Sequence, residues 1–164
     1  MYDIKKLKQN IDELKKLDEA SWDAICKNCG LCCMTKVEDD DNKIYYSNYA
    51  CPHFDITSRK CKCYDCRLKN NSCQKITLEH ILAGRSMPDS CAYVERVFGP
   101  AKFPAEIDWS TTRNISDLEF DDMELMTTDL IPTSFLWSAR YNVGNEIFPN
   151  YESIIEELSE YIKK

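Results

Sequence analysis

Ten cysteines are the residues of this 164-residue chain whose type and spacing point most directly to chemistry. Four of them fall within eight residues, in the motif Cys26-Lys27-Asn28-Cys29-Gly30-Leu31-Cys32-Cys33. The other six follow at Cys51, Cys61, Cys63, Cys66, Cys73 and Cys91. Three kinds of chemistry explain such a concentration: disulfide bonds, metal ligation and thiol catalysis.

The spacing of the first motif suits a metal centre. Cys26, Cys29 and Cys32 can place three thiolates around one ion, as zinc knuckles and iron–sulfur loops do. Neighbouring side chains diverge by about 100° on a helix and point to opposite faces of a strand, so we expect Cys32 and Cys33 to face different surroundings. Cys61 and Cys63 would share one face of an extended strand. The sequence does not assign which thiols bind the same metal centre.

Metal ligation also explains how the cysteine-rich segment folds. Residues 50–75 are polar and offer little apolar surface to offset their conformational entropy. A structural zinc site contributes roughly 10–16 kcal/mol, comparable to the whole stability of a domain, about 5–15 kcal/mol. One occupied centre would therefore decide whether residues 26–91 fold.

Disulfide bonds and thiol catalysis are the alternatives. The N-terminus has no apolar segment of the secretory type, and cytosolic thiols are kept reduced, which argues against disulfides. A catalytic thiol would need a base, and His53 and His80 are the only histidines. We expect both to be surface or packing residues, or at most substitute metal ligands. Cys66 is interpreted as a buried, reduced cysteine.

Composition narrows the class of protein. The net charge of −7 argues against nucleic-acid binding, which needs a basic surface. No apolar run approaches the roughly 18 residues that span a bilayer. We therefore expect a cytoplasmic protein with no nucleic-acid and no membrane partner.

Hydrophobic periodicity and turn residues predict an α+β fold: a small metal-stapled domain, with short helices and a β-hairpin around the cysteine cluster. Amphipathic helices are expected at both ends of the chain, the first over about the first twenty residues and the last after Asn150. Between them we expect a short helix from about Ser21, a hairpin over 34–49, a helix over 77–83 capped by Thr77 and closed by Gly84, and a helix starting near Ser90.

The composition changes after Gly99-Pro100. Residues 101–164 hold five Lys or Arg and thirteen Asp or Glu, a balance of −8. We predict a cysteine-cluster domain over 1–99 and an acidic extension over 100–164, packed on the same domain. This acidic region is the candidate surface for a protein partner.

The motif Cys26-x-x-Cys29-Gly30-x-Cys32-Cys33 resembles the signature of the CxxCxxCC, or YkgJ-type, cysteine-cluster family. The downstream residues Cys51-x-x-Phe54-Asp55, Cys61-x-Cys63-Tyr64-x-x-Arg67 and Cys73 follow the pattern of that family. Trp22, the acidic hairpin and Met87-Pro88-x-Ser90-Cys91-Ala92-Tyr93 resemble its YcgN-type, UPF0260-like branch over about residues 17–99. Cys66 departs from the pattern, and residues 100–164 do not follow it.

The resemblance implies a zinc- or iron-chelating protein. Similar motifs in a flagellin lysine methylase are associated with an iron–sulfur cluster, but this chain shows no cofactor-binding motif that would carry methylation over. We predict zinc or an iron–sulfur cluster, in a scaffold or a redox component, and assign no catalytic residue. The predicted thiolate ligands are Cys26, Cys29, Cys32, Cys33, Cys51, Cys61, Cys63, Cys73 and Cys91.

Tyr64 and Arg67 are candidates for positions around the ligands, because a hydroxyl can donate to sulfur and a guanidinium offsets thiolate charge. Ordinary packing and a surface charge are the alternative for these two residues. The alternative function is a thiol-based redox or metal-trafficking protein with exchangeable cysteines.

Overall fold

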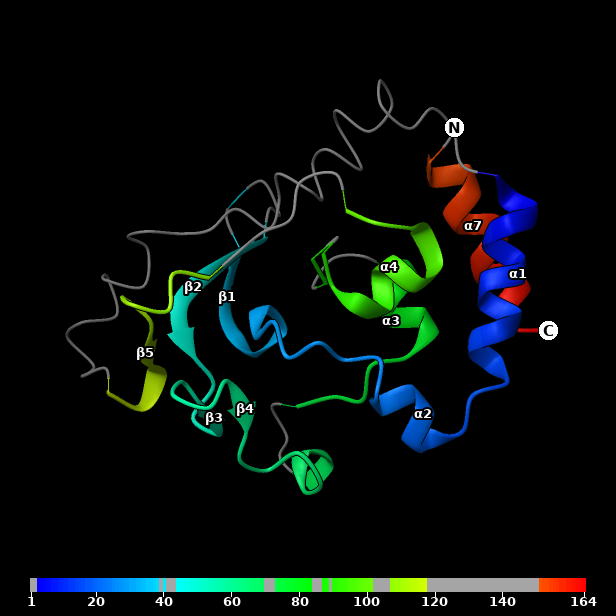
Figure 1. The fold of residues 1–164 in the computed structure, drawn as a ribbon. Helices are drawn as coiled ribbons and strands as arrows, with labels where there is room; N and C mark the ends of the chain where they lie inside the picture. The colour runs from blue at the N-terminus through cyan, green and yellow to red at the C-terminus, as the bar shows by residue number, and fades with distance from the viewer. Residues whose placement is uncertain are drawn as a thin grey trace. The chain divides into compact units, whose positions relative to one another are not determined.

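A computed structural model describes residues 3–38, 40, 44–69, 73–83, 87–88, 90–101, 107–117 and 151–164 (Figure 1). Helices and short strands occur together, which confirms the α+β class. The chain divides into two compact units. The helical unit comprises Met1–Lys27, Thr77–Ala105 and Thr133–Lys164, and the cysteine unit comprises Asn28–Ile76 and Glu106–Pro132.

The helical unit contains both terminal helices, α1 (Ile4–Lys15) and α7 (Tyr151–Ile162), which lie side by side (Figure 1). Each buries the apolar stripe that its periodicity predicts, at Leu7, Ile11 and Leu14 of α1 and at Ile154 and Leu158 of α7. Both predicted terminal helices are thus confirmed, although α1 ends at Lys15 and the predicted cap Asn150 lies outside the described residues.

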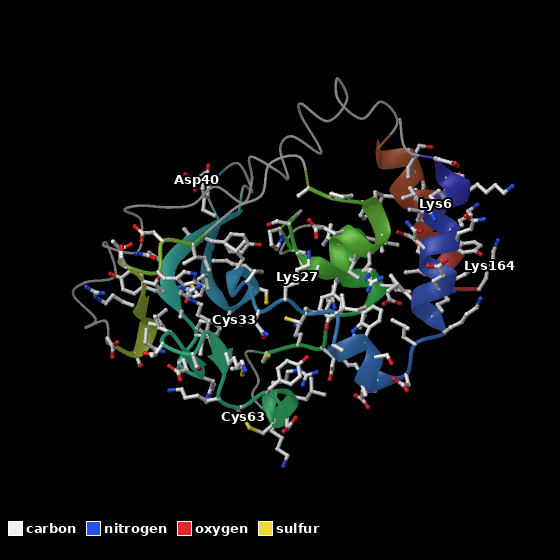
Figure 2. All side chains as sticks on the ribbon, viewed as in Figure 1. Lys6, Lys27, Cys33, Asp40, Cys63 and Lys164 are labelled. Atoms are coloured by element: carbon white, nitrogen blue, oxygen red, sulfur yellow. A yellow bond between two sulfur atoms is a disulfide. The ribbon has the colours of Figure 1, made fainter. Side chains whose placement is uncertain are left out.

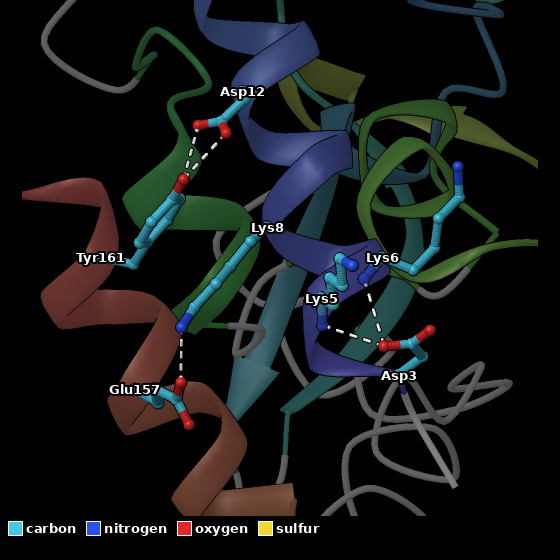
Figure 3. A network of polar contacts seen from close by, with 7 residues as sticks. All are labelled: Asp3, Lys5, Lys6, Lys8, Asp12, Glu157 and Tyr161. Atoms are coloured by element: carbon cyan, nitrogen blue, oxygen red, sulfur yellow. Dashed lines mark hydrogen bonds and ion pairs between the residues drawn. The ribbon is translucent and has the colours of Figure 1, made fainter.

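Polar contacts reinforce the pairing of α1 with α7 (Figure 3). The Lys8 ammonium donates to Glu157 at 2.6 Å, and the Tyr161 hydroxyl lies 2.9 and 2.8 Å from the two carboxylate oxygens of Asp12. The Asp3 carboxylate accepts hydrogen bonds from the first backbone N–H groups of α1 and so caps it. These contacts join the two ends of the chain within the helical unit.

Three shorter helices belong to the part of the helical unit that the structure describes. In α2 (Glu19–Asp23), Asp18 is the cap, since its carboxylate accepts the Ser21 N–H at 2.8 Å, and the helix therefore begins before the predicted residue. The Thr77 hydroxyl accepts the His80 N–H at 3.4 Å at the start of α3 (Leu78–Ala83), as predicted. α4 (Ala92–Phe98) follows Cys91, also as predicted, while Gly84 lies outside the described residues.

The cysteine unit is built on the predicted hairpin of β1 (Met34–Glu38) and β2 (Ile44–Ala50), which pair antiparallel. The short strand β5 (Arg113–Asn114) pairs in parallel with β2 (Figure 1). A second hairpin joins β3 (Phe54–Asp55) to β4 (Lys60–Cys61). Three 3₁₀ turns cover Leu31–Cys33, Arg67–Lys69 and Ile115–Asp117.

Residues beyond position 100 enter both units: residues 107–117 belong to the cysteine unit and α7 to the helical unit. The predicted division after residue 99 remains a prediction. Among the described residues, no helix is both long and apolar enough to cross a bilayer.

Candidate metal centre

The ends of the first hairpin bring Cys33 and Cys51 together. Cys33 immediately precedes β1 and Cys51 immediately follows β2, and the ladder pairs Met34 with Ala50 between them. The Cys51 N–H donates to the Cys33 carbonyl at 2.8 Å, which extends the ladder past both strands. Strand pairing therefore places two cysteines that are distant in sequence at one end of the hairpin.

The second hairpin carries Cys61 to the same region. Cys61 pairs with Phe54, and the Phe54 N–H donates to the Cys51 carbonyl at 2.9 Å. The Asn114 side chain donates to the carbonyls of both Cys51 and Phe54, at 3.0 and 3.3 Å. Asn114 of β5 thus holds the turn that joins the two hairpins.

Gly30 allows the chain to turn sharply before Cys32 and Cys33. Its φ of +78° lies in the left-handed region, which glycine adopts without the cost that a Cβ brings. A Cβ at this position would lie 2.6 Å from the Trp109 ring and 3.2 Å from the Phe54 ring. Trp109 stacks on Phe54 at 5.8 Å between ring centroids, with the Arg59 guanidinium 4.9 Å from the Trp109 ring centroid. The turn at Gly30 is therefore both sharp and packed against the aromatic rings of Trp109 and Phe54.

The sulfur atoms of Cys32 and Cys33 lie only 3.9 Å apart. The prediction that these neighbours face different surroundings is therefore wrong, because the 3₁₀ turn ends at Cys33 and the backbone changes direction into β1. A hydrogen bond between the two sulfurs lowers the pKa of Cys32 to about 7 and raises the pKa of Cys33. Cys32 is therefore the first of the two thiols to lose its proton as the pH rises.

Further thiols act on this pair. The charges of Cys61 and Cys51 contribute to the raised pKa of Cys33. Burial, followed by the charge of Cys61, raises the pKa of Cys73, and the Arg67 guanidinium opposes that shift. We call the five thiols that act on one another in this way the thiol cluster: Cys32, Cys33, Cys51, Cys61 and Cys73.

Cys63 and Cys66 form a disulfide bond (Figure 2). Their Cα atoms are 5.0 Å apart, which is within the range that a disulfide bridges, because the chain turns between them. The interpretation of Cys66 as a buried, reduced cysteine is therefore wrong. Cys63 also lies past the end of β4 rather than on an extended strand with Cys61. A disulfide sulfur is no thiolate, so Cys63 can ligate a metal only after reduction.

Tyr64 and Arg67 contact each other. The Arg67 guanidinium lies 3.9 Å from the Tyr64 ring centroid and donates to the Tyr64 carbonyl at 2.6 Å. The Arg67 guanidinium also opposes the rise in the pKa of Cys73, and its predicted place beside metal ligands remains a prediction. A hydrogen bond from the Tyr64 hydroxyl to sulfur remains a prediction.

Cys26 and Cys91 belong to the helical unit. Cys91 is buried at 6% exposure and Cys26 is half-buried. Lys27, which follows Cys26, forms an ion pair with Glu95 of α4 at 2.7 Å. This ion pair therefore links the segments that follow the two cysteines in the chain.

The remaining candidates lie nearer to solvent. Cys29 and His53 are exposed. The His80 ring nitrogen Nδ1 lies 3.2 Å from the Thr77 hydroxyl at the start of α3, a capping position. This agrees with the expected surface and packing roles of the histidines.

The chain is also similar in sequence to named proteins. A UPF0260 protein of Serratia proteamaculans is 35% identical over 91 residues, which are 54% of this chain and 60% of that protein. UPF0260 proteins of Shewanella pealeana and Vibrio cholerae are 37% and 38% identical over 82 residues, 49% of this chain and 56% and 57% of theirs. The chain is similar to these UPF0260 proteins over about half of its length. The match spans less than two thirds of each of these relatives. No protein-family model and no solved structure matches the chain.

This similarity confirms the UPF0260-like part of the predicted resemblance, and the CxxCxxCC family signature remains a prediction. Among the described residues, no three Cys, His, Asp or Glu side chains are grouped closely enough to hold a metal ion. The thiol cluster is nevertheless close enough for its members to shift one another's pKa. Metal binding would therefore require the thiols to come closer together than they lie here.

Three contributors to this site were not predicted from the sequence. Lys36 donates to the carbonyl of Cys32, and the alternation of residues along the hairpin did not predict this contact. Trp109 and Asn114 come from a segment that does not follow the resemblance. The only feature of the sequence that pointed to this segment was Trp109, an apolar residue in a polar, acidic region.

Proposed function

We propose that this protein is a metal-binding cysteine-cluster protein, in which the thiol cluster holds zinc or an iron–sulfur cluster. One observation carries the proposal: the paired strands of the two hairpins bring Cys33, Cys51 and Cys61 into one region of the cysteine unit, where the sulfur of Cys32 lies 3.9 Å from that of Cys33. The raised pKa of Cys73, to which the charge of Cys61 contributes, adds a fifth thiol to this region. Thiolates are the preferred ligands of zinc and of iron–sulfur clusters. Relationship to the UPF0260 proteins is compatible with this function and does not specify it.

The electrostatics of the thiol cluster favour a cation. The pKa of Cys33 is raised by its bond to Cys32, and burial raises that of Cys73, so these thiols keep their protons at neutral pH. A bound metal ion stabilises thiolates and displaces the protons. A divalent ion or a cluster would also relieve the repulsion between thiolates, which contributes to both raised pKa values.

The identity of the bound metal determines the role of the protein. Zinc, which has no redox chemistry, would make the protein a folded scaffold. An iron–sulfur cluster would make it a redox component of a larger system. The further predicted ligands are Cys26, Cys29, Cys63 and Cys91. Tyr64 remains a predicted neighbour of the ligands. The acidic region 100–164 remains the predicted surface for a protein partner.

A thiol-based redox or metal-trafficking function is the second candidate. The Cys63–Cys66 disulfide and the lowered pKa of Cys32 favour it, because exchange needs a dithiol pair or a reactive thiolate. It predicts rapid modification of native Cys32 by a thiol reagent, whereas a closed metal site predicts slow modification until a chelator is added.

Anaerobic purification followed by metal analysis and a visible spectrum tests the main proposal. Brown protein with iron and sulfide would identify a cluster, and colourless protein with zinc would identify a scaffold. Cys33→Ser and Cys51→Ser should lose most of the metal, while Cys66→Ser, outside the thiol cluster, should retain it. Wild-type protein that is folded and takes up neither metal would overturn the proposal.

A further inference from the structure

We propose that Lys36 is a positioning residue of the metal centre, whose ammonium group compensates the negative charge of the thiolates and so raises their affinity for a metal ion. This inference rests on the metal-binding function proposed above. It concerns a residue of β1 that is neither a thiol nor part of the cysteine motif.

Three groups hold the ammonium group of Lys36. It donates to the Cys32 carbonyl at 3.0 Å and lies 3.4 Å from the Met34 carbonyl. It also lies 5.5 Å from the ring centroid of Tyr46, the residue opposite Lys36 in the β1–β2 ladder, which is itself fully buried. Carbonyl oxygens and an aromatic face both attract a cation. The charge is thus held at the turn that carries Cys32 and Cys33.

An irregularity in the pairing of β1 with β2 explains why the Lys36 side chain extends toward Cys32. The register of β1 against β2 shifts between Met34 and Lys36. Irregularities of this kind re-aim a side chain. Lysine side chains usually extend until the ammonium reaches water. Here the side chain instead turns back along its own strand toward Cys32, four residues earlier.

The ammonium group of Lys36 lies at the turn that carries two predicted ligands. It donates to the carbonyl of Cys32, and the sulfur of Cys32 lies 3.9 Å from that of Cys33. A zinc ion with four thiolates carries a net charge of about −2, which is costly to bury without compensation. A fixed cation beside the thiols supplies that compensation before any metal arrives.

The test compares the Zn(II) affinity of full-length, reduced, metal-free variants in competition with a chromophoric chelator. Lys36→Met removes the charge and the donor, Lys36→Gln keeps a donor without the charge, and Lys36→Arg keeps the charge. Lys60→Met is the matched control, because Lys60 is exposed on β4 beside Cys61. Circular dichroism of each metal-free variant reports whether it folds.

Lys36→Met and Lys36→Gln should both lose about 10–100-fold in affinity, the usual effect of residues that support metal ligands. Lys36→Arg should restore most of the affinity, and Lys60→Met should match the wild type. Equal affinity of Lys36→Gln and wild type would overturn the inference, as would a loss in Lys36→Arg as large as in Lys36→Met. Wild-type protein that is folded and takes up neither Zn(II) nor, on anaerobic reconstitution, an iron–sulfur cluster would instead refute the proposed function. If Lys36→Met does not fold, the comparison of Lys36→Gln with Lys36→Arg decides.

Discussion

The backbone N–H of Cys51 lies 2.8 Å from the carbonyl oxygen of Cys33 and donates a hydrogen bond to it. This bond continues the β1–β2 ladder, so the approach of the two cysteines follows from the pairing of a hairpin. The hairpin has its own buried residues, among them Met34, Tyr46 and Ala50. Strand pairing and packing therefore arrange the backbone around the thiols. A bound metal would add the ligation of the sulfur atoms to this arrangement.

Replacement of Gly30 tests the packing of the cysteine turn. Gly30→Ala adds a Cβ at φ +78° and 2.6 Å from the Trp109 ring. Gly99→Ala adds a Cβ at φ +88° with nothing within 4 Å, so it shares the positive φ and lacks the clash. Urea denaturation should show that Gly30→Ala loses about 1–3 kcal/mol more unfolding free energy than Gly99→Ala. Equal losses would mean that Trp109 does not pack on the turn.

The Cys63–Cys66 disulfide predicts a definite thiol count. Aerobically purified, unfolded, metal-free protein should show eight reactive thiols, and ten after reduction. Cys66→Ser should show nine thiols under both conditions, because its partner Cys63 is then free. A count of ten in the wild type before any reductant would show that this bond is not formed.

The sequence was informative where pattern and local chemistry act together. Periodicity predicted α1 and α7, and Thr77 predicted the start of α3. It was misleading for Cys32 and Cys33, since regular helix and strand geometry does not describe a 3₁₀ turn that ends at a strand. Contacts such as those of Asn114 with Cys51 depend on tertiary pairing of β5 with β2, which short-range pattern does not reveal.

Truncation on α7 tests whether the terminal helix docks on the helical unit. Leu158 is fully buried, whereas Leu17 is 40% exposed. Leu158→Ala should reduce the unfolding free energy by about 2–5 kcal/mol. The control Leu17→Ala should change it far less, by about 0.5 kcal/mol or below. Similar small effects of both substitutions, measured by urea denaturation, would indicate that α7 is free to bind a partner.

The ion pair of Glu95 with Lys27 predicts a pH dependence. The Lys27 ammonium, the main cause, lowers the pKa of Glu95 below its value in the unfolded chain. The resulting stabilisation is therefore complete above the unfolded-state pKa and is lost as the pH falls through the folded-state pKa. Glu95→Gln should cost about 0.2–1 kcal/mol at pH 7, as exposed pairs do.

The difference between wild type and Glu95→Gln should shrink as unfolding is measured at successively lower pH, down to about pH 3. Glu156→Gln removes an exposed glutamate of α7 and serves as the control for a change in net charge. A Glu95→Gln difference that stays constant from pH 7 to pH 3 would show that the carboxylate is not stabilised by Lys27.

X-ray absorption at the metal edge of the anaerobically purified protein tests the central claim most directly, because it identifies the atoms bound to the metal. We predict a shell of three or four sulfur atoms at about 2.3 Å for zinc. For iron we predict sulfur ligation with a second shell from neighbouring iron atoms, as a cluster requires. Substitution of Cys33 or Cys51 by serine should deplete that sulfur shell. A first shell of oxygen and nitrogen alone would contradict the account.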